Sequence, residues 1–194
     1  MRIGRYLLGA LLAFTVAIGG LYVYVNLRIA SGNFGVVVPG EVYRSAQVTP
    51  EMIRDYRERY GIATILNLRP PSPGADWYDA EVATSAELGI MQVDFGMSSG
   101  RMLPLDRAKE LIALMERLPK PLLIHCDSGA NRTGLASALY LAVIEGRPEE
   151  EAEAQLSLRY GHFPIEWPDE ISPMYATFEV LEYALAFDDD ESES

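Results

Sequence analysis

Residues 121–134 read PLLIHCDSGANRTG and combine an apolar run, a cysteine, a short turn and an arginine. The apolar run 121–125 predicts a buried strand, and a helix is expected to begin near Arg132. A tight turn between a strand and a helix points successive backbone N–H groups to one side, and Gly129 allows the dihedral angles that this requires. The helix N-terminus adds about half a positive charge. The stretch therefore predicts a site for an anionic phosphate group.

Cys126 and Arg132 stand at the two ends of this turn. The planar guanidinium of Arg132 can bind two phosphate oxygens, and the positive field of the turn stabilises a nucleophilic thiolate at Cys126. One pocket is thus expected to bind a phosphate and to present a sulfur atom in line with the phosphorus. A cysteine at a strand end is usually a small buried hydrophobe, and the arginine six positions later disfavours that interpretation.

The composition sets limits on the class of protein. The chain has 194 residues, of which 49% are hydrophobic and 23% charged, as in a globular protein. Its net charge of −12 repels polyphosphate backbones, so nucleic acid is not expected as a partner. One cysteine excludes an internal disulfide, and with two histidines it is too few for a structural zinc site, so no metal or cofactor is expected.

Strand and helix patterns alternate along the chain, which predicts an α/β fold with a mostly parallel sheet flanked by helices. In such sheets ligands bind at the carboxyl ends of strands, where Cys126 is expected to lie. Residues 26–40 are interpreted as a linker and a lead-in strand. The expected strands are 41–46, 62–68, 90–95 and 121–125, and the expected helices are 50–60, 76–88, 106–118, 132–145, 148–160 and 169–187.

An apolar segment precedes this domain. Residues 6–25 contain no charge and, as a helix, would extend about 30 Å, the thickness of a bilayer's hydrocarbon core. Arg2 and Arg5 precede the segment and Arg28 follows it, which favours a cytoplasmic N-terminus. We expect residues 1–28 to be a single-pass membrane anchor. A cleaved signal peptide, ending near residue 19, is the alternative.

Two further parts are expected to follow the anchor. Residues 33–187 are expected to form one domain on the periplasmic side of the membrane, and residues 188–194 an acidic, solvated tail.

HCDSGANRTG (125–134) resembles the HC-x5-R-[S/T] signature of cysteine-dependent protein tyrosine and dual-specificity phosphatases. VYRSAQ (42–47), ILNLR (65–69) and LSLRYGHF (156–163) are similar to segments of the bacterial, membrane-anchored, dual-specificity-like branch. The resemblance implies the three-layer protein tyrosine phosphatase-like fold and makes residues 33–187 the catalytic domain.

The resemblance also implies a role for each residue of the signature. Cys126 would attack phosphorus and form a phosphocysteine, while Arg132 would bind the phosphate and stabilise the transition state. His125 would help to ionise the thiol, and Thr133 would hydrogen-bond to the sulfur and help it to leave. As a buried strand residue and a helix-start residue, these two also have purely structural interpretations. The backbone amides lining the phosphate cradle would be those of Asp127, Ser128, Gly129, Ala130, Asn131 and Arg132.

Relatives protonate the leaving oxygen with an aspartate on a loop some thirty residues before the cysteine. Asp94, at the end of the expected strand 90–95, fits this spacing, although the following loop contains no acid. Asp106 is the competing candidate, with an alternative role as a helix N-terminal carboxylate. The spacing favours Asp94.

The cradle positions also indicate a substrate class. Family members that act on polyphosphoinositides tend to carry lysine in the loop, whereas here Asp127 lies beside the pocket of an acidic protein. A phosphorylated protein is therefore the expected partner, with phosphotyrosine first and phosphoserine or phosphothreonine next. A phosphoinositide or inositol phosphate phosphatase and a catalytically weak phosphate-binding module are the alternatives. Arg44 and Arg69 are candidates for positive potential around the pocket or, equally, for structural ion pairs. Arg101 is expected to be an exposed loop residue that contacts a substrate or nothing.

Overall fold

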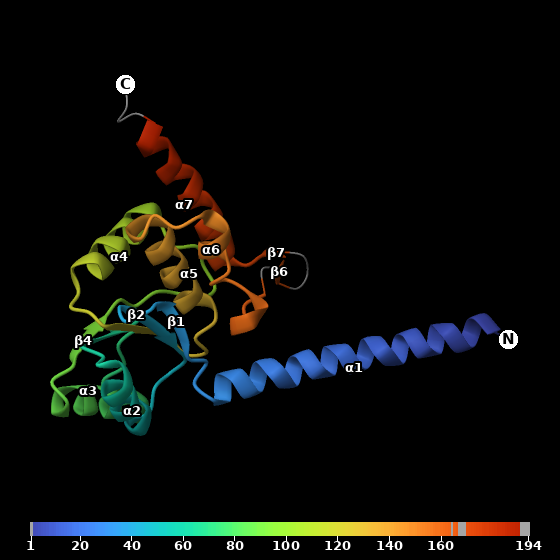
Figure 1. Ribbon diagram of the computed structural model, residues 1–194, viewed down its shortest axis with the longest axis horizontal. Helices are drawn as coiled ribbons and strands as arrows, with labels where there is room; N and C mark the ends of the chain where they lie inside the picture. Colours follow the sequence, from blue (N-terminus) through green and yellow to red (C-terminus); the bar gives the residue numbers. More distant parts are fainter. Residues whose placement is uncertain (1, 164, 167–169, 191–194) are drawn as a thin grey trace.

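Five strands form one sheet in the computed structural model (Figure 1), in the order β1-β2-β5-β3-β4. The structure describes residues 2–163, 165–166 and 170–190. β1 pairs antiparallel with β2, and the other strands run parallel to β2, so the expected mostly parallel sheet is confirmed. The strands are β1 (Gly35–Val38), β2 (Val42–Ser45), β3 (Thr64–Asn67), β4 (Met91–Asp94) and β5 (Leu122–His125).

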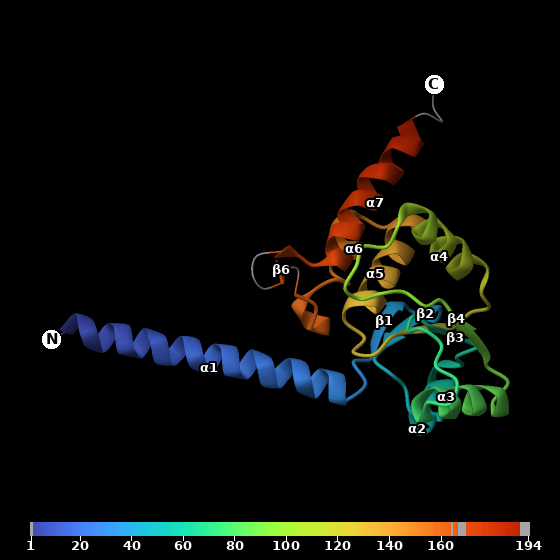
Figure 2. The same ribbon diagram turned by 180° about the vertical axis from the view of Figure 1, so that it is seen from behind.

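Helices cover both faces of this sheet, as Figures 1 and 2 show. One face carries α2 (Pro50–Tyr60) and α3 (Asp76–Glu87), and the other carries α4 (Leu105–Arg117), α5 (Asn131–Leu139) and α7 (Pro173–Asp190). The three-layer architecture is therefore confirmed. The shorter elements are a π-helix (Tyr140–Ile144), α6 (Glu149–Glu153), a 3-10 turn (Leu158–Tyr160), β6 (Ile165–Glu166) and β7 (Glu170–Ile171).

The central strand β5 lies between two hydrophobic cores. Leu122 and Ile124 are fully buried in the core beneath α4, α5 and α7, and Leu123 is fully buried in the core beneath α2 and α3. This explains why PLLIH is apolar at successive positions, because a parallel strand covered on both faces has no solvent side.

Some helix boundaries depend on local signals alone. The Thr49 side chain accepts a hydrogen bond from the Met52 amide at the start of α2, and Gly61 ends the helix at φ 69°. A capping hydroxyl and a left-handed glycine are the expected helix signals, and both lie where the sequence predicted them.

The predicted helix 148–160 is wrong beyond its first turns. α6 ends at Glu153, and the chain then turns until the 3-10 segment. The Gln155 carbonyl accepts from buried Arg44, whereas in a continuous helix it would accept from the amide of residue 159. The Tyr160 carbonyl accepts from buried Asn33.

Four further boundaries differ from the prediction. Residues 26–30 belong to the N-terminal helix α1 (Arg2–Ala30) and do not form a linker, and α5 passes into the π-helix after Leu139. α7 begins at Pro173, four residues after the predicted start, and residues 167–169 lie outside the described part. The predicted acidic tail begins inside α7, and residues 191–194 are also outside the described part.

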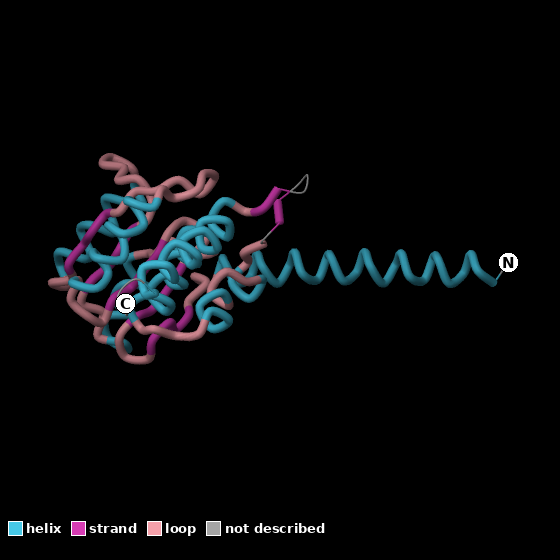
Figure 3. Tube along the Cα trace, turned by 90° about the horizontal axis from the view of Figure 1, so that it is seen from above, coloured by secondary structure: helices cyan, strands magenta, loops and turns pink. Residues whose placement is uncertain are grey.

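α1 (Arg2–Ala30) projects away from the domain as one long helix (Figure 3). By length and composition its segment Gly9–Ala30 can cross a membrane, with a mean hydropathy of 1.8. Its last turns contact the domain, because Val25 is buried and the Tyr24 hydroxyl donates to the Arg159 carbonyl at 3.4 Å.

Candidate active site

Cys126 follows the last residue of the central strand and is buried. The turn after it, residues 127–130, leads directly into α5. The neighbouring strands end at the same level, since His125 aligns with Ser45 of β2 and with Asn67 of β3. The candidate nucleophile thus lies where ligands bind in parallel sheets.

Three successive carbonyls of the turn accept hydrogen bonds from outside it. The pairs are the Gln47 amide to Asp127 O (2.9 Å), the Asn33 side chain to Ser128 O (2.9 Å) and the Arg44 guanidinium to Gly129 O (2.7 Å). Because the N–H of a trans peptide points away from its C=O, these bonds turn the next three amides toward the opposite side. Amides that face one side in this way are what the predicted cradle of N–H donors requires. One of these amides, that of Ala130, also lies 3.3 Å from the Ser128 hydroxyl.

Gly129 is required by the geometry of this turn. Its φ is +71°, in the left-handed region, and a Cβ atom would lie 2.6 Å from the Ser45 carbonyl oxygen. The turn therefore approaches the backbone of β2 more closely than any side chain permits.

Arg44 lies behind the cradle, fully buried. Its guanidinium binds Gly129 O and Gln155 and stacks at 3.7 Å on the Tyr160 ring. Burial lowers the pKa of Arg44 to about 10, so the side chain stays charged at neutral pH. Arg44 therefore has both a structural and an electrostatic role, because it supports the turn through Gly129 O and places a positive charge beneath it.

The Arg132 guanidinium has N–H donors that a ligand could use. One of its terminal nitrogens donates to the Met97 carbonyl at 3.5 Å, whereas its buried Nε has no partner among the described residues. A buried N–H without an acceptor is costly, and a phosphate oxygen would satisfy it. Asn131 at the same helix start accepts a hydrogen bond from His162 at 2.9 Å. The Thr133 hydroxyl is buried and likewise makes no hydrogen bond within the described part, so its expected bond to the sulfur stays a prediction.

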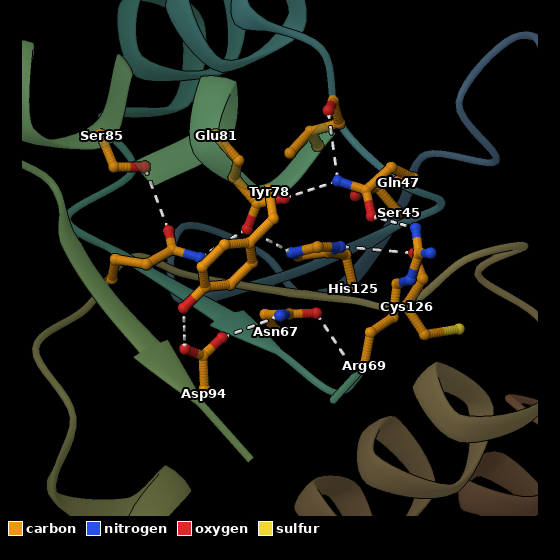
Figure 4. Close-up of polar contacts among 12 residues, drawn as sticks. Ser45, Gln47, Asn67, Arg69, Tyr78, Glu81, Ser85, Asp94, His125 and Cys126 are labelled. Carbon is orange, nitrogen blue, oxygen red and sulfur yellow. Dashed lines mark hydrogen bonds and ion pairs between the residues drawn. The ribbon is translucent and has the colours of Figure 1, made fainter. Parts of the chain in front are cut away.

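His125 lies on a buried polar network that Figure 4 displays. Its Nε2 is 2.9 Å from Glu81 Oε1, and both side chains are fully buried. Gln92 donates to the same carboxylate oxygen, and Gln47 donates to the other one. Burial alone would raise the pKa of Glu81, but the hydrogen bond and charge of His125 and the two amides outweigh it, so the net shift is downward.

Arg69 connects this network to the rim of the site. Its guanidinium donates to the Gln47 side-chain oxygen at 2.8 Å, lies 3.2 Å from the carboxylate of Asp127, and stacks at 3.6 Å on the Trp77 ring. The Asp127 side chain is 69% exposed. The carboxylate beside the pocket therefore has an arginine partner, and Arg69 contributes positive potential at the rim.

Asp94 ends β4, and β3 separates it from the strand of Cys126. At the usual strand spacing the two residues are about 10 Å apart along the sheet edge. Asn67 donates to one carboxylate oxygen of Asp94 at 2.8 Å and the Tyr78 hydroxyl to the other at 2.6 Å, as Figure 4 shows. The hydrogen bond to Asp94 is the main reason why the pKa of Tyr78 is raised to about 12.

A pocket opens beside Asp94. Its lining consists of Pro70, Pro71, Asp94, Gly96, Met97, Ser98 and Arg101. Met97 joins this pocket to the cradle through its hydrogen bond with Arg132. Asp106 lies in the first turn of α4, exposed, and is not among the lining residues. Asp94 as the proton donor therefore stays a prediction, with Asp106 as the alternative.

Several supporting residues were missed by the sequence interpretation. Asn33 and Glu81 contact residues that are 95 and 44 positions away, so no local pattern marks them. Gln47 lies in the segment VYRSAQ, but neither its type nor its place in the sequence indicates a role.

Comparisons with known proteins agree with this geometry. A model of the "Tyrosine phosphatase family" matches residues 24–154, which is more than half of the sequence. The chain belongs to the tyrosine phosphatase family. This membership confirms the expectation of a cysteine-dependent phosphatase. Among curated proteins, none matches the sequence significantly.

Solved structures of phosphatases share the fold. TpbA of P. aeruginosa is 20% identical with a TM-score of 0.61, and the match covers 81% of this chain and 92% of that one. The catalytic core of the PP-IP phosphatase SIW14 of S. cerevisiae is 20% identical with a TM-score of 0.63, covering 83% and 92%. PTPMT1 is 11% identical with a TM-score of 0.62, covering 81% and 99%. The phosphatase therefore has the three-layer fold that its signature implied.

Proposed function

We propose that this phosphatase hydrolyses phosphate monoesters on proteins, phosphotyrosine first, through a phosphocysteine at Cys126. The single observation that carries the proposal is the cradle. A buried cysteine and an arginine whose Nε has no partner among the described residues flank a turn, and three carbonyls of this turn accept hydrogen bonds from residues outside it. Such a site binds a phosphate dianion and leaves the sulfur behind the phosphorus.

The chemistry proceeds in two displacements. The Cys126 thiolate attacks phosphorus, the P–O bond to the leaving group breaks, and Arg132 with the cradle amides stabilises the charge on the equatorial oxygens. Asp94 gives its proton to the leaving oxygen. Water, deprotonated by the same carboxylate, then attacks the phosphocysteine, and the S–P bond breaks to release inorganic phosphate.

The rim of the site supports a monoester on a protein side chain. Trp77 and the ring of Tyr78 lie next to each other, with centroids 5.4 Å apart, and Trp77 stacks on Arg69 beside Asp127. Aromatic side chains near the turn and Asp94 can pack against the ring of an aromatic phosphoester. A cysteine-to-serine variant of TpbA has been solved in complex with pTyr. That structure is 18% identical to this chain, and the match covers 79% of this chain and 95% of that one.

The test compares substrates at equal concentration. The full chain in detergent, with chelator and reductant, is assayed for phosphate release from a phosphotyrosine peptide, a phosphoserine peptide and an inositol polyphosphate. Fastest release from phosphotyrosine supports the proposal. Faster release from the inositol polyphosphate would favour the alternative substrate class, which SIW14, a PP-IP phosphatase of similar fold, represents. Binding of a phosphopeptide without release of phosphate from any of the three substrates would indicate a binding module.

We also propose that α1 is an uncleaved single-pass anchor that holds the domain at the periplasmic face. The apolar segment and the preceding positive charges support this orientation. An alkaline phosphatase fusion after residue 30 should be active in the periplasm and should remain with the membrane fraction. Release of the fusion as a soluble protein would indicate a cleaved signal peptide.

A further inference from the structure

The carboxylate of Glu81 occupies an unusual position. It is fully buried, yet it belongs to α3, two layers away from the helix that binds phosphate. Its three hydrogen-bond donors are His125, Gln92 and Gln47 (Figure 4), of which the last two are neutral amides. A buried carboxylate is strongly destabilised unless a positive group pairs with it. Among these three partners, only His125 can carry that charge.

The surroundings of the His125 ring point to the same protonation state. Nε2 faces the Glu81 carboxylate at 2.9 Å, and Nδ1 faces the backbone carbonyl of Cys126 at 3.3 Å. An ionised carboxylate and a carbonyl can only accept hydrogen bonds, so each ring nitrogen needs its own proton. A neutral imidazole would leave one lone pair facing an oxygen.

We propose that Glu81 is a positioning residue that holds His125 as an imidazolium, and that this cation favours the thiolate at Cys126. The inference rests on the proposed function in taking Cys126 as the nucleophile. Glu81 does not touch the phosphate or the sulfur, and it acts through the histidine.

The cation acts on the cradle in two ways. It places a positive charge next to the cysteine in the chain, inside a dry environment where charges interact strongly. It also donates to the Cys126 carbonyl, which polarises that peptide and makes its amide, the N–H of Asp127, a stronger donor. Both effects stabilise negative charge at the entrance to the turn.

Other charged groups also face this region. Arg44 lies behind the turn, Arg132 lies at the start of α5, and Arg69 reaches Gln47 and the exposed carboxylate of Asp127 from the end of β3. Arg44 and Arg132 bond to groups outside the Glu81 network and are not displaced when Glu81 alone is replaced. Arg69 bonds to Gln47, which donates to Glu81, so the contribution of the histidine has to be separated from that of Arg69 by a double substitution.

The test is a thiol titration of the full chain in detergent. Cys126 is the only cysteine, so thiolate absorbance and iodoacetate alkylation report this residue alone. Without the carboxylate, His125 is expected to lose its proton and with it the positive charge near Cys126. The titration midpoint of the thiol in Glu81→Gln should therefore rise by about one pH unit, the lower limit for losing a nearby opposite charge. Alkylation near pH 6 should slow about tenfold. Glu87→Gln is the matched control, since Glu87 lies on the same helix with its side chain exposed and paired with Arg54. This control should titrate like the wild type.

A double substitution shows whether Glu81 acts through the histidine. Glu81→Gln combined with His125→Gln should titrate like His125→Gln alone. An unchanged midpoint in folded Glu81→Gln, or additive shifts in the double variant, would overturn the proposal.

If the Glu81 variant does not fold, the wild type still decides the question. The chain has two histidines, so ¹⁵N-labelled His125 can be assigned by difference with His162→Asn. Two protonated ring nitrogens at neutral pH are expected, and a neutral ring would overturn the proposal. Neither measurement needs a substrate, so this inference and the hydrolysis reaction can fail independently.

Discussion

The burial of His162 predicts that the free energy of unfolding falls measurably in mild acid. Its ring is fully buried and donates from Nδ1 to the Asn131 side chain, whereas its buried Nε2 has no partner among the described residues. Burial, with a contribution from the charge of Arg44, lowers the pKa of His162 from 6.5 to about 4. Between these values the unfolded chain binds a proton that the folded chain does not, so stability falls as the pH falls.

The size of the effect follows from that difference in pKa. Lowering the pKa from 6.5 to about 4 corresponds to about 3 kcal/mol. This is a large share of the roughly 5–15 kcal/mol that stabilises a typical domain. The loss should begin near pH 6.5 and level off near pH 4, where the folded protein also becomes protonated.

Urea unfolding of the full chain in detergent, followed by tryptophan fluorescence, measures the free energy of unfolding between pH 7.5 and pH 4. The comparison is His162→Asn, whose amide can still donate to Asn131 but does not titrate. Carboxylates titrate equally in both proteins, so the difference between wild type and variant isolates the histidine. The stability of the wild type relative to the variant should fall by about 3 kcal/mol over this range. A difference that does not change with pH would refute the reasoning.

Three further predictions concern the cradle and the acid. The free energy of unfolding should be lower in Gly129→Ala than in Gly40→Ala by at least about 1 kcal/mol, and Gly129→Ala should lose activity. Both glycines have a positive φ, but of the two only Gly129 would bring the new Cβ against backbone atoms. Urea unfolding and a phosphatase assay measure the two effects. Asp94→Asn should remove the basic limb of the pH–rate profile while Asp106→Asn keeps it, and the reverse result would reassign the acid. Arg132→Lys should lower kcat/KM for an aryl phosphate about a hundredfold, because a point charge replaces a planar fork; full activity in steady-state kinetics would contradict the proposed clamp.

The local parts of the site could be predicted from the sequence. The strand, the turn and the start of the helix around Cys126 lie within residues 121–134, and their order alone places a thiol and an arginine at one turn. The parallel sheet followed from the alternation of apolar and helical patterns. The left-handed φ of Gly129 followed from its place in the turn.

The groups that hold the cradle in place could not be predicted in this way. Asn33 reaches Ser128 across 95 residues, and Glu81 reaches His125 across 44. These contacts exist only once the sheet has brought the elements together. The failure of the predicted helix 148–160 has the same cause, because buried Arg44 binds the Gln155 carbonyl, which a continuous helix would use internally.

The central claim is that phosphate passes through the sulfur of Cys126. The most direct measurement is a rapid acid quench of the full chain during turnover of an aryl phosphate, with chelator present, followed by peptide mass spectrometry. The account predicts a phosphorylated peptide that contains Cys126, its disappearance in Cys126→Ser, and loss of turnover in that variant. Continued turnover by Cys126→Ser, or phosphate found on a different residue, would contradict it.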